Sequence, residues 1–258
     1  MGERDQLVPD WRDAAGYAPL LHADRSLIAW EWLRRDPAYR EAADRAARSG
    51  DDMAHGSGGP PGRWGLCRFE DPYRRVPAAR PLWRTEVHPF VLGVEARPGK
   101  GADDFDLERV AAGSILVRGA GDREHLMISD GLHAVRIDVL AGSLARGPVE
   151  LSYRLAGLAS AERPLLTLRR LLALWRTGRF CRSVHAAEAK AGRWVLMLRA
   201  HDAVADGAGQ REIAAELLGG RVVPKRWRVE ESSVRSWVQR LVRSARSAAD
   251  GGYRKLLL

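Results

Sequence analysis

Cysteine and long apolar runs are the scarcest features of this 258-residue sequence. Cys67 and Cys181 are the only cysteines, and neither lies in a spacing typical of metal ligands. The sequence therefore argues against a disulfide framework and a zinc site, and it favours a reducing compartment. No apolar run approaches the roughly 18 residues that span a bilayer, and the first ten residues contain no apolar signal core. We expect a cytoplasmic protein that does not enter a membrane.

The known local motifs of catalysis are missing as well. The sequence contains no His-Glu-x-x-His, Cys-x-x-Cys or Gly-x-Ser-x-Gly, and no phosphate loop ending in Gly-Lys-Ser or Gly-Lys-Thr. None of the seven histidines lies four residues from another. His201 beside Asp202 is interpreted as a capping or packing residue. We predict no catalytic residue, no cofactor and no metal, although a site assembled from distant residues would leave no local motif.

Positive charge is present, and it is concentrated in the C-terminal part. The whole chain has a net charge of +9, whereas residues 163–258 hold 20 Lys and Arg against 8 Asp and Glu, a net of +12. The other 162 residues carry a net charge of −3. This asymmetry predicts a nucleic-acid-binding module joined to a neutral partner. Basic segments also bind acidic proteins and anionic membranes, so charge alone leaves those partners open.

Two helices and then irregular structure are expected in the first third of the chain. Asp24 is placed to cap one helix, and Asp36 with Pro37 provides the N-cap and first residue of a second. Five prolines are scattered through residues 63–98, which predicts mostly irregular structure there.

A change to a period of two between residues 113 and 155 predicts a small antiparallel sheet. Apolar and polar residues alternate along several short segments, and Asp130-Gly131 is a strong signal for a tight hairpin. The predicted strands are residues 114–118, 125–129, 133–140 and 149–155.

Helical spacing returns at Pro164 and continues towards the C-terminus. The predicted helices are residues 164–177, 192–205, 210–218 and 232–250. The fold class is therefore α+β, with an N-terminal helical segment, a small central antiparallel β-sheet and a C-terminal all-helical variant helix-turn-helix domain. The predicted domain boundaries are 8–90, 91–160 and 161–258.

The segment from Ser232 to Asp250 is the strongest functional signal in the chain. On a helix its apolar residues gather on one face, and the opposite face carries serine, glutamine and arginine without a carboxylate. Solvated helix faces usually mix both signs of charge. We therefore predict a surface that contacts nucleic acid.

A bracing helix at 210–218 followed by this segment has the pattern of a helix-turn-helix. Serine and glutamine side chains there can contact base edges, Arg235 can contact bases or phosphate, and the later arginines suit phosphate. The candidate DNA-binding residues are Gln210, Arg211, Lys225, Arg226, Arg228, Ser232, Arg235, Ser236, Gln239, Arg240, Arg243 and Arg246. The connection at 219–231 is much longer than the usual turn of about 3–4 residues. An ordinary helical pair with a basic outer face therefore stays open as an alternative.

Blocks of sequence in both halves of the chain resemble known proteobacterial domains. The C-terminal blocks, in order, are residues 165–174, 193–196, 198–203, 210–214 and 251–257. They resemble the RovC-type DNA-binding domain. Trp11-Arg12 and residues 29–40 resemble the transcriptional-regulator-like domain often fused to it. The layout is similar to that of RovC- and FseA-type transcriptional activators. Gly209 departs from the Ser or Thr cap that family members often carry.

This resemblance implies an activator that binds promoter double-stranded DNA and recruits RNA polymerase. It implies target genes in a mobile conjugative element or a secretion system, and control by a small antiactivator of the same domain family. Homo-oligomerisation stays open, and no operator sequence carries over. The alternatives are an antiactivator or protein-interaction module, and a DNA-bending recombination accessory factor.

Overall fold

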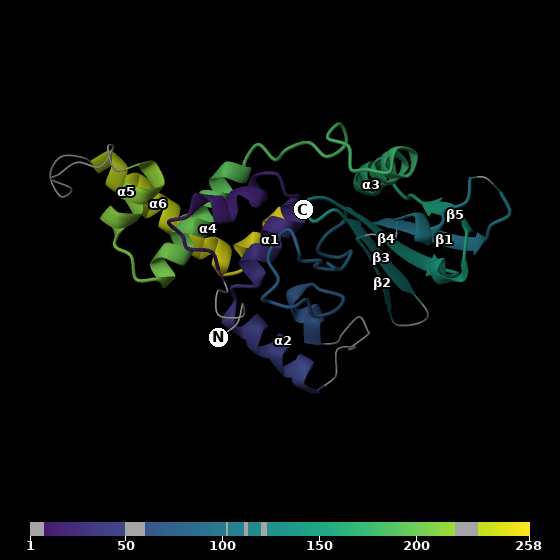
Figure 1. Cartoon of the computed structure of the whole chain (residues 1–258), viewed down its shortest axis with the longest axis horizontal. Coiled ribbons are helices and arrows are strands. Elements are labelled where there is room, and N and C mark those ends of the chain that lie inside the picture. The colour runs from purple at the N-terminus through teal and green to yellow at the C-terminus, as the bar shows by residue number, and fades with distance from the viewer. Residues whose placement is uncertain (1–7, 50–59, 102, 111–112, 120–122, 220–231) are drawn as a thin grey trace.

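The computed structural model describes residues 8–49, 60–101, 103–110, 113–119, 123–219 and 232–258 (Figure 1). It is elongated, with a β-sheet at one end, helices α4 (Ala191–Ala205), α5 (Gln210–Leu218) and α6 (Ser232–Ala249) at the other, and the N-terminal helices between them. Helices make up 49% of the structure and strands 16%. The predicted α+β class is confirmed.

The remaining elements follow the chain order shown in Figure 1. The other helices are η2 (Ala14–Leu21), α1 (Arg25–Leu33), α2 (Pro37–Ser49), η3 (Pro60–Trp64), η4 (Leu107–Val110), η6 (Leu144–Arg146), α3 (Leu158–Thr177) and η8 (Gly252–Leu256). The strands are β1 (Leu92–Pro98), β2 (Ser114–Arg118), β3 (Glu124–Ser129), β4 (Ala134–Ala141) and β5 (Val149–Arg154). No helix in the described part of the chain is both long and apolar enough to cross a membrane.

The N-terminal helices begin where the sequence predicts, but only one of the two predicted side-chain caps forms. Asp36 accepts a hydrogen bond from the backbone N–H of Ala38 at 2.9 Å, as an N-cap does. Asp24 lies at the N-cap of α1, yet its carboxylate makes no capping bond. It accepts instead from the backbone N–H of Ala134 at 3.0 Å, at the start of β4. The long-range bond to the sheet therefore replaces the local cap.

The sheet has five strands in the order β2-β3-β4-β1-β5, and it is mixed. β2, β3, β4 and β5 match the predicted strands within two residues at each end. β1 lies in a stretch predicted to be irregular, and it pairs with β4 in parallel, with Leu92 opposite Ile137. The prediction of a wholly antiparallel sheet is therefore wrong for the pairing of β1 with β4. Parallel strands are joined by a long connection, so no short turn in the sequence indicates that β1 pairs with β4.

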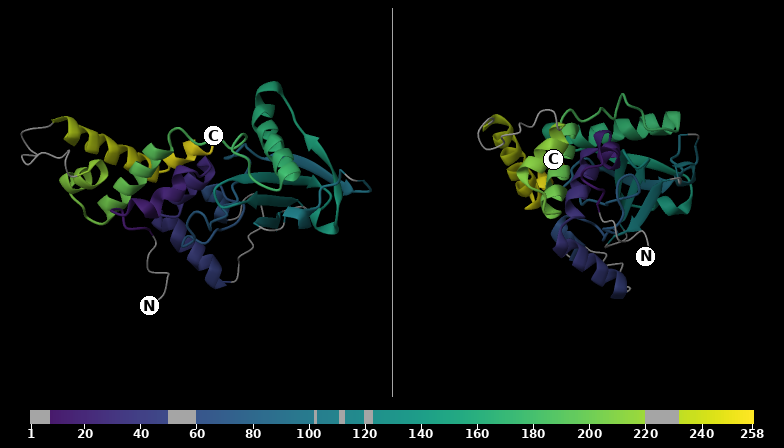
Figure 2. Two further views of the ribbon diagram at one scale, coloured as in Figure 1. Left: turned by 45° about the horizontal axis from the view of Figure 1, so that its top comes forward. Right: turned by 60° about the vertical axis from the view of Figure 1, so that its left-hand side comes forward.

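Helix α3 covers one face of the sheet (Figure 2). It begins at Leu158, earlier than predicted, and Pro164 lies inside it rather than at its start. The first turn is exposed, so it has no apolar periodicity that a sequence pattern could detect. The helix ends at Thr177, as predicted, and Gly178 after it has the left-handed conformation, with φ of 69°. Leu171 and Leu174 pack with the buried side chains of the strands.

The N-terminal helices and the C-terminal end of the chain share a second core. Trp30 is 0% exposed and contacts Tyr39 edge to face, with ring centroids 5.6 Å apart. Side chains from α4, α6 and η8, including Leu198, Ala245 and Tyr253, belong to the same buried cluster. The two ends of the sequence therefore form one body in the middle of the molecule (Figure 1).

Candidate nucleic-acid interface

Helix α6 presents the amphipathic pattern that its sequence predicts. On its apolar face Val238 is 0% and Ala245 is 1% exposed. Ser236, on the other side, is half-buried. The exposed side chains of α6 include Arg235, Gln239, Arg240, Arg243 and Arg246. Since the helix contains no Asp or Glu, its outer surface is positively charged.

Helix α5 packs against α6 through a small apolar core. Ile213 and Ala214 of α5 are buried in one cluster with Val234 and Val238 of α6. Side chains of α4, among them Ala200, complete this cluster. The predicted bracing contact between the two helices is therefore present.

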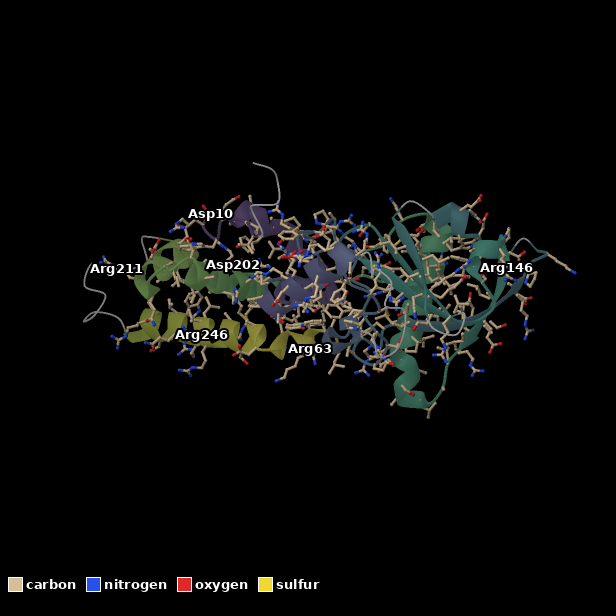
Figure 3. All side chains as sticks on the ribbon, turned by 90° about the horizontal axis from the view of Figure 1, so that it is seen from below. Asp10, Arg63, Arg146, Asp202, Arg211 and Arg246 are labelled. Carbon is tan, nitrogen blue, oxygen red and sulfur yellow. The ribbon has the colours of Figure 1, made fainter. Side chains whose placement is uncertain are left out.

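Gln210 and Arg211 are exposed at the start of α5, at the same end of the molecule as α6. Figure 3 shows Arg211 and Arg246 towards one end, whereas Arg146 lies at the opposite end beside the sheet. Of the remaining candidates, Lys225, Arg226 and Arg228 lie outside the described residues, and the side chain of Ser232 is not described either. The candidate positions that the structure describes thus gather at one end of the molecule.

The N-terminal segment contributes a tryptophan to this end, which sequence patterns did not indicate. Trp11 is buried in the apolar cluster shared by α4, α5 and α6. Its indole N–H donates to the Asp206 carboxylate at 3.0 Å, and Arg199 of α4 donates to the Trp11 carbonyl at 2.9 Å. Nothing in the spacing of the sequence links residues about 190 positions apart. The contact joins the N-terminal segment directly to the helices of the interface.

A buried ionic network lies behind the interface. The two carboxylate oxygens of Asp202 accept from Nε and Nη2 of Arg35, both at 2.8 Å, and the hydroxyl of Tyr17 donates to Asp202 at 2.7 Å. Burial alone raises the pKa of Asp202, but the guanidinium of Arg35 outweighs this and holds the pKa well below its usual range. Arg35 also pairs with Glu31 of α1 at 2.7 Å. Asp202 is thus a structural residue that ties α4 to α1.

His201, the other residue of that pair, has a packing role. Its ring lies edge-on to Trp32 of α1, with centroids 5.6 Å apart. Its Nδ1 lies 3.3 Å from the Asp202 carboxylate. The packing interpretation of His201 is confirmed.

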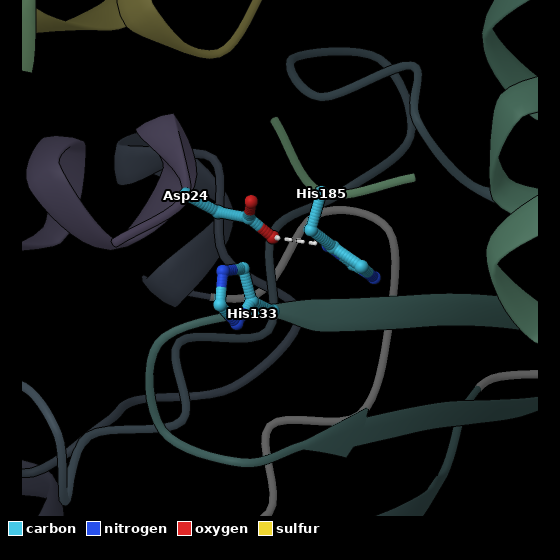
Figure 4. Close-up of side chains that lie close together, drawn as sticks. All are labelled: Asp24, His133 and His185. Carbon is cyan, nitrogen blue, oxygen red and sulfur yellow. Dashed lines mark ion pairs between the residues drawn. The ribbon is translucent and has the colours of Figure 1, made fainter. Parts of the chain in front are cut away.

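The described residues contain one group of metal-ligand types, Asp24, His133 and His185, whose ligand atoms lie within 4.8 Å of one another (Figure 4). His185 Nδ1 lies 3.8 Å from the Asp24 carboxylate, and Arg170 lies 3.9 Å from the same oxygen. Burial raises the pKa of Asp24, but the neighbouring His185 and the charge of Arg170 give a net lowering. The positive charge of Arg170 already balances the carboxylate and opposes a divalent ion there.

The same group joins three segments of the chain. Asp24 precedes α1, His133 lies in the β3–β4 turn, and His185 lies between α3 and α4. These side chains therefore form a polar contact between the sheet and the helices. That the chain binds no metal stays a prediction.

Two models of known protein families match separate regions of the chain. Residues 156–258 match the family model described as T6SS, Transcription factor, DNA binding domain, of the RovC type. The C-terminal part is therefore similar to DNA-binding domains of this type. Residues 10–69 match the proteobacterial transcriptional regulator-like domain. A comparison with curated proteins gave no match.

The two domains occur in the predicted arrangement, and they identify the chain as a non-enzymatic transcriptional regulator with a DNA-binding domain. The RovC-type match includes α3, which packs on the sheet, as well as α4, α5 and α6 at the other end. The matched region therefore contacts both the sheet and the core of the N-terminal helices. The predicted domain boundaries at 90 and 160 stay predictions.

Proposed function

We propose that the RovC-type domain binds double-stranded promoter DNA in a sequence-specific way, with α6 in the major groove and α5 bracing it. The observation that carries this proposal is the outer face of α6, where four exposed arginines lie without a carboxylate on a helix whose other face is fixed in a core. A rigid helix with such a face suits the negative potential of the groove and its flanking phosphates.

The side chains on α6 fall into two roles under this proposal. Arg235, Ser236 and Gln239 are assigned to base edges, because they lie in the N-terminal half of the helix and can pair with acceptors and donors there. The later arginines are assigned to phosphates, as are Gln210 and Arg211, which lie at a helix N-terminus. The assignment also retains the positions predicted from sequence alone, Lys225, Arg226, Arg228 and Ser232. The later arginines are Arg240, Arg243 and Arg246.

The helix assignment is tested with the double variant Arg235→Ala, Gln239→Ala. DNA fragments that the parent protein selects from a random pool serve as the specific probe, and a shuffled fragment serves as the nonspecific one. We expect the affinity ratio between the two probes to fall by about 10- to 100-fold or more, as the loss of base contacts predicts. Arg146→Ala, at the opposite end of the molecule, is the matched control and should leave the ratio unchanged. If the double variant kept the parent's ratio, α6 would not be the recognition helix.

The finer role proposed for the chain is that of a cytoplasmic activator of genes in a mobile conjugative element or a secretion system. The support is the pairing of the RovC-type domain with the transcriptional regulator-like domain. Contact with RNA polymerase and control by a small antiactivator of the same domain family belong to this proposal. A promoter fused to a reporter, with and without the protein, distinguishes activation from repression by the sign of the change.

A further inference from the structure

A pocket lies where the sheet meets α1 and α3. Its volume is about 380 Å³, within the range of about 300–1,000 Å³ that small-molecule sites usually have. The residues that line it come from the start of α1, the segment before β1, strands β3 and β4, α3, the connection from α3 to α4, and η8. None of the candidate DNA-binding residues that the structure describes is among them. The pocket is therefore separate from the candidate nucleic-acid interface.

The wall of the pocket is mainly apolar. Trp83 is 1% and Met127 is 3% exposed. Phe90, Leu166 and Leu256 are half-buried beside them. Trp83 and Phe90 are aromatic, and aromatic side chains pack well against another ring in offset or edge-on contacts. The pocket therefore suits a ligand with an apolar, aromatic body.

Four arginines and two carboxylates are among the described residues that line the pocket. Three of the arginines are already paired with carboxylates of the protein. The pairs are Arg25 with Glu188 at 2.5 Å, Arg170 with Asp24 at 3.9 Å and Arg136 with Asp138 at 3.0 Å. Because these charges are balanced within the protein, they do not by themselves select an anionic ligand.

Arg169 and Ser26 also line the pocket, and both have polar atoms to offer a ligand. Arg169 is exposed, and within the described residues it forms no ion pair. Ser26 is 7% exposed, and within the same residues its hydroxyl makes no hydrogen bond. A guanidinium binds a carboxylate through two parallel N–H donors, and a hydroxyl can donate a further hydrogen bond. These two side chains can therefore hold a carboxylate in the pocket.

The carboxylates of the lining limit the charge of the ligand. Asp24 and Glu188 both line the pocket, and each is paired with an arginine of the protein. A ligand with two negative charges, such as a phosphate monoester, would meet one unpaired arginine, and the two carboxylates would repel its second charge. A single negative charge on the ligand matches Arg169.

We propose that this pocket binds a small aromatic carboxylate. The carboxylate pairs with Arg169 and accepts a hydrogen bond from Ser26, and the ring packs against Trp83 and Phe90. Because the lining comes from the sheet, α1, α3 and η8, the ligand would contact all of these elements at once. The proposal goes beyond DNA binding and does not depend on it, since the ligand is measured on the protein without DNA.

The test titrates the full-length protein with cinnamate in a calorimeter, and we expect saturable binding. Cinnamamide has nearly the same shape but no charge, so it should bind at least about 10-fold more weakly. Octanoate carries the carboxylate without the ring and should also bind more weakly, and inorganic phosphate should not compete with cinnamate. The proposal would be overturned if cinnamate did not bind, if cinnamamide or octanoate bound as tightly, or if phosphate competed.

Variants of α3 and α1 locate the site. Arg169→Gln should weaken cinnamate binding by about 10-fold or more and leave cinnamamide binding unchanged, because only the pairing with the charge is lost. Ser26→Ala should weaken cinnamate binding by about 2- to 10-fold. The matched control is Arg176→Gln, an exposed arginine of α3 that does not line the pocket, and it should bind cinnamate as the parent does.

Circular dichroism checks that each variant is folded. A folded Arg169→Gln variant with the parent's affinity for cinnamate would show that the carboxylate does not bind in this pocket. Equal losses in Arg169→Gln and Arg176→Gln would likewise contradict the proposal, because they would indicate a general effect of charge.

Discussion

At the scale of single residues, two acidic groups near the candidate interface are paired with a residue from the other end of the sequence. Arg12 contacts Asp206, which follows α4, at 3.2 Å, and Glu212 in the first turn of α5 at 2.5 Å. The hydrogen bond to Glu212 is the main cause of a raised pKa for Arg12. The indole of Trp11 lowers the pKa of Asp206, and Arg12 adds to this. Both carboxylates are thus paired within the protein itself.

The arginines further along α6 make a prediction about salt. Replacing Arg243 with alanine removes one proposed phosphate contact, so the slope of log affinity against log salt concentration should become shallower by about one. Arg246→Ala should do the same, and the loss of affinity should be similar for specific and nonspecific DNA. Titrations at several salt concentrations measure the slope. An unchanged slope in both variants would remove these residues from the interface, with Arg146→Ala as the control.

At the scale of elements, α4 is the helix that joins the parts of the molecule. Its Asp202 pairs with Arg35, which follows α1, and Arg199 on the same helix donates hydrogen bonds to the backbone carbonyls of residues 11 and 12. Ala200 and Ala203 face the core shared with α5 and α6. The orientation of α5 and α6 therefore depends on contacts with the N-terminal helices.

The Asp202–Arg35 pair predicts a large loss of stability on mutation. Asp202→Asn leaves the guanidinium of Arg35 buried with only part of its compensating charge, so the free energy of unfolding should fall by about 3–5 kcal/mol. Urea denaturation measures this change. Asp206→Asn, four residues later and exposed, is the control and should cost much less, because solvent screens its pairing. Equal losses in the two variants would contradict the structural role of the buried pair.

At the scale of the whole molecule, the C-terminal end returns to the middle. Leu257 is 1% exposed in the core of the N-terminal helices, and its carbonyl accepts a hydrogen bond from Nδ1 of His88 at 3.0 Å. Arg254 donates to the carbonyl of Arg63 at 2.9 Å. The segment that leads into β1 is thereby tied to the end of the region that matches the RovC-type domain.

His88 makes the stability of this arrangement dependent on pH. Burial lowers the pKa of His88 to about 4, although the bond to Leu257 opposes the shift. In the unfolded chain a histidine has a pKa of about 6.5. Between these values the unfolded chain binds a proton that the folded chain does not, so stability falls as pH falls from 6.5 to 4. This histidine alone should lower the free energy of unfolding by about 2 kcal/mol between pH 7 and pH 5.

Urea midpoints at pH 7 and pH 5 test this. The parent should lose stability on acidification, and His88→Asn should lose about 2 kcal/mol less. His185, whose pKa is lowered chiefly by burial, contributes in the same direction and accounts for part of the remaining loss. The exposed His22 is the control, and His22→Asn should behave as the parent does. A parent-like pH dependence in His88→Asn would show that the ring is not held neutral by burial.

The sequence by itself determined the elements whose residues are periodic. The bounds of α5 agree with the prediction, those of α6 differ by one residue, and four strands were located by alternation. These elements bury one face and expose the other, so their period appears directly in the order of residues. The same reason made the basic face of α6 visible, because it is set by the helix itself.

Only the tertiary structure decided what each element contacts. The parallel pairing of β1 with β4, the insertion of Trp11 between the C-terminal helices, and the use of Asp24 to bind the sheet all join distant parts of the chain. The sequence did not indicate the ion pair between Asp202 and Arg35, because a single buried carboxylate produces no periodic pattern. Local patterns encode which face of an element is apolar, whereas the partner of that face depends on how the whole chain closes its cores.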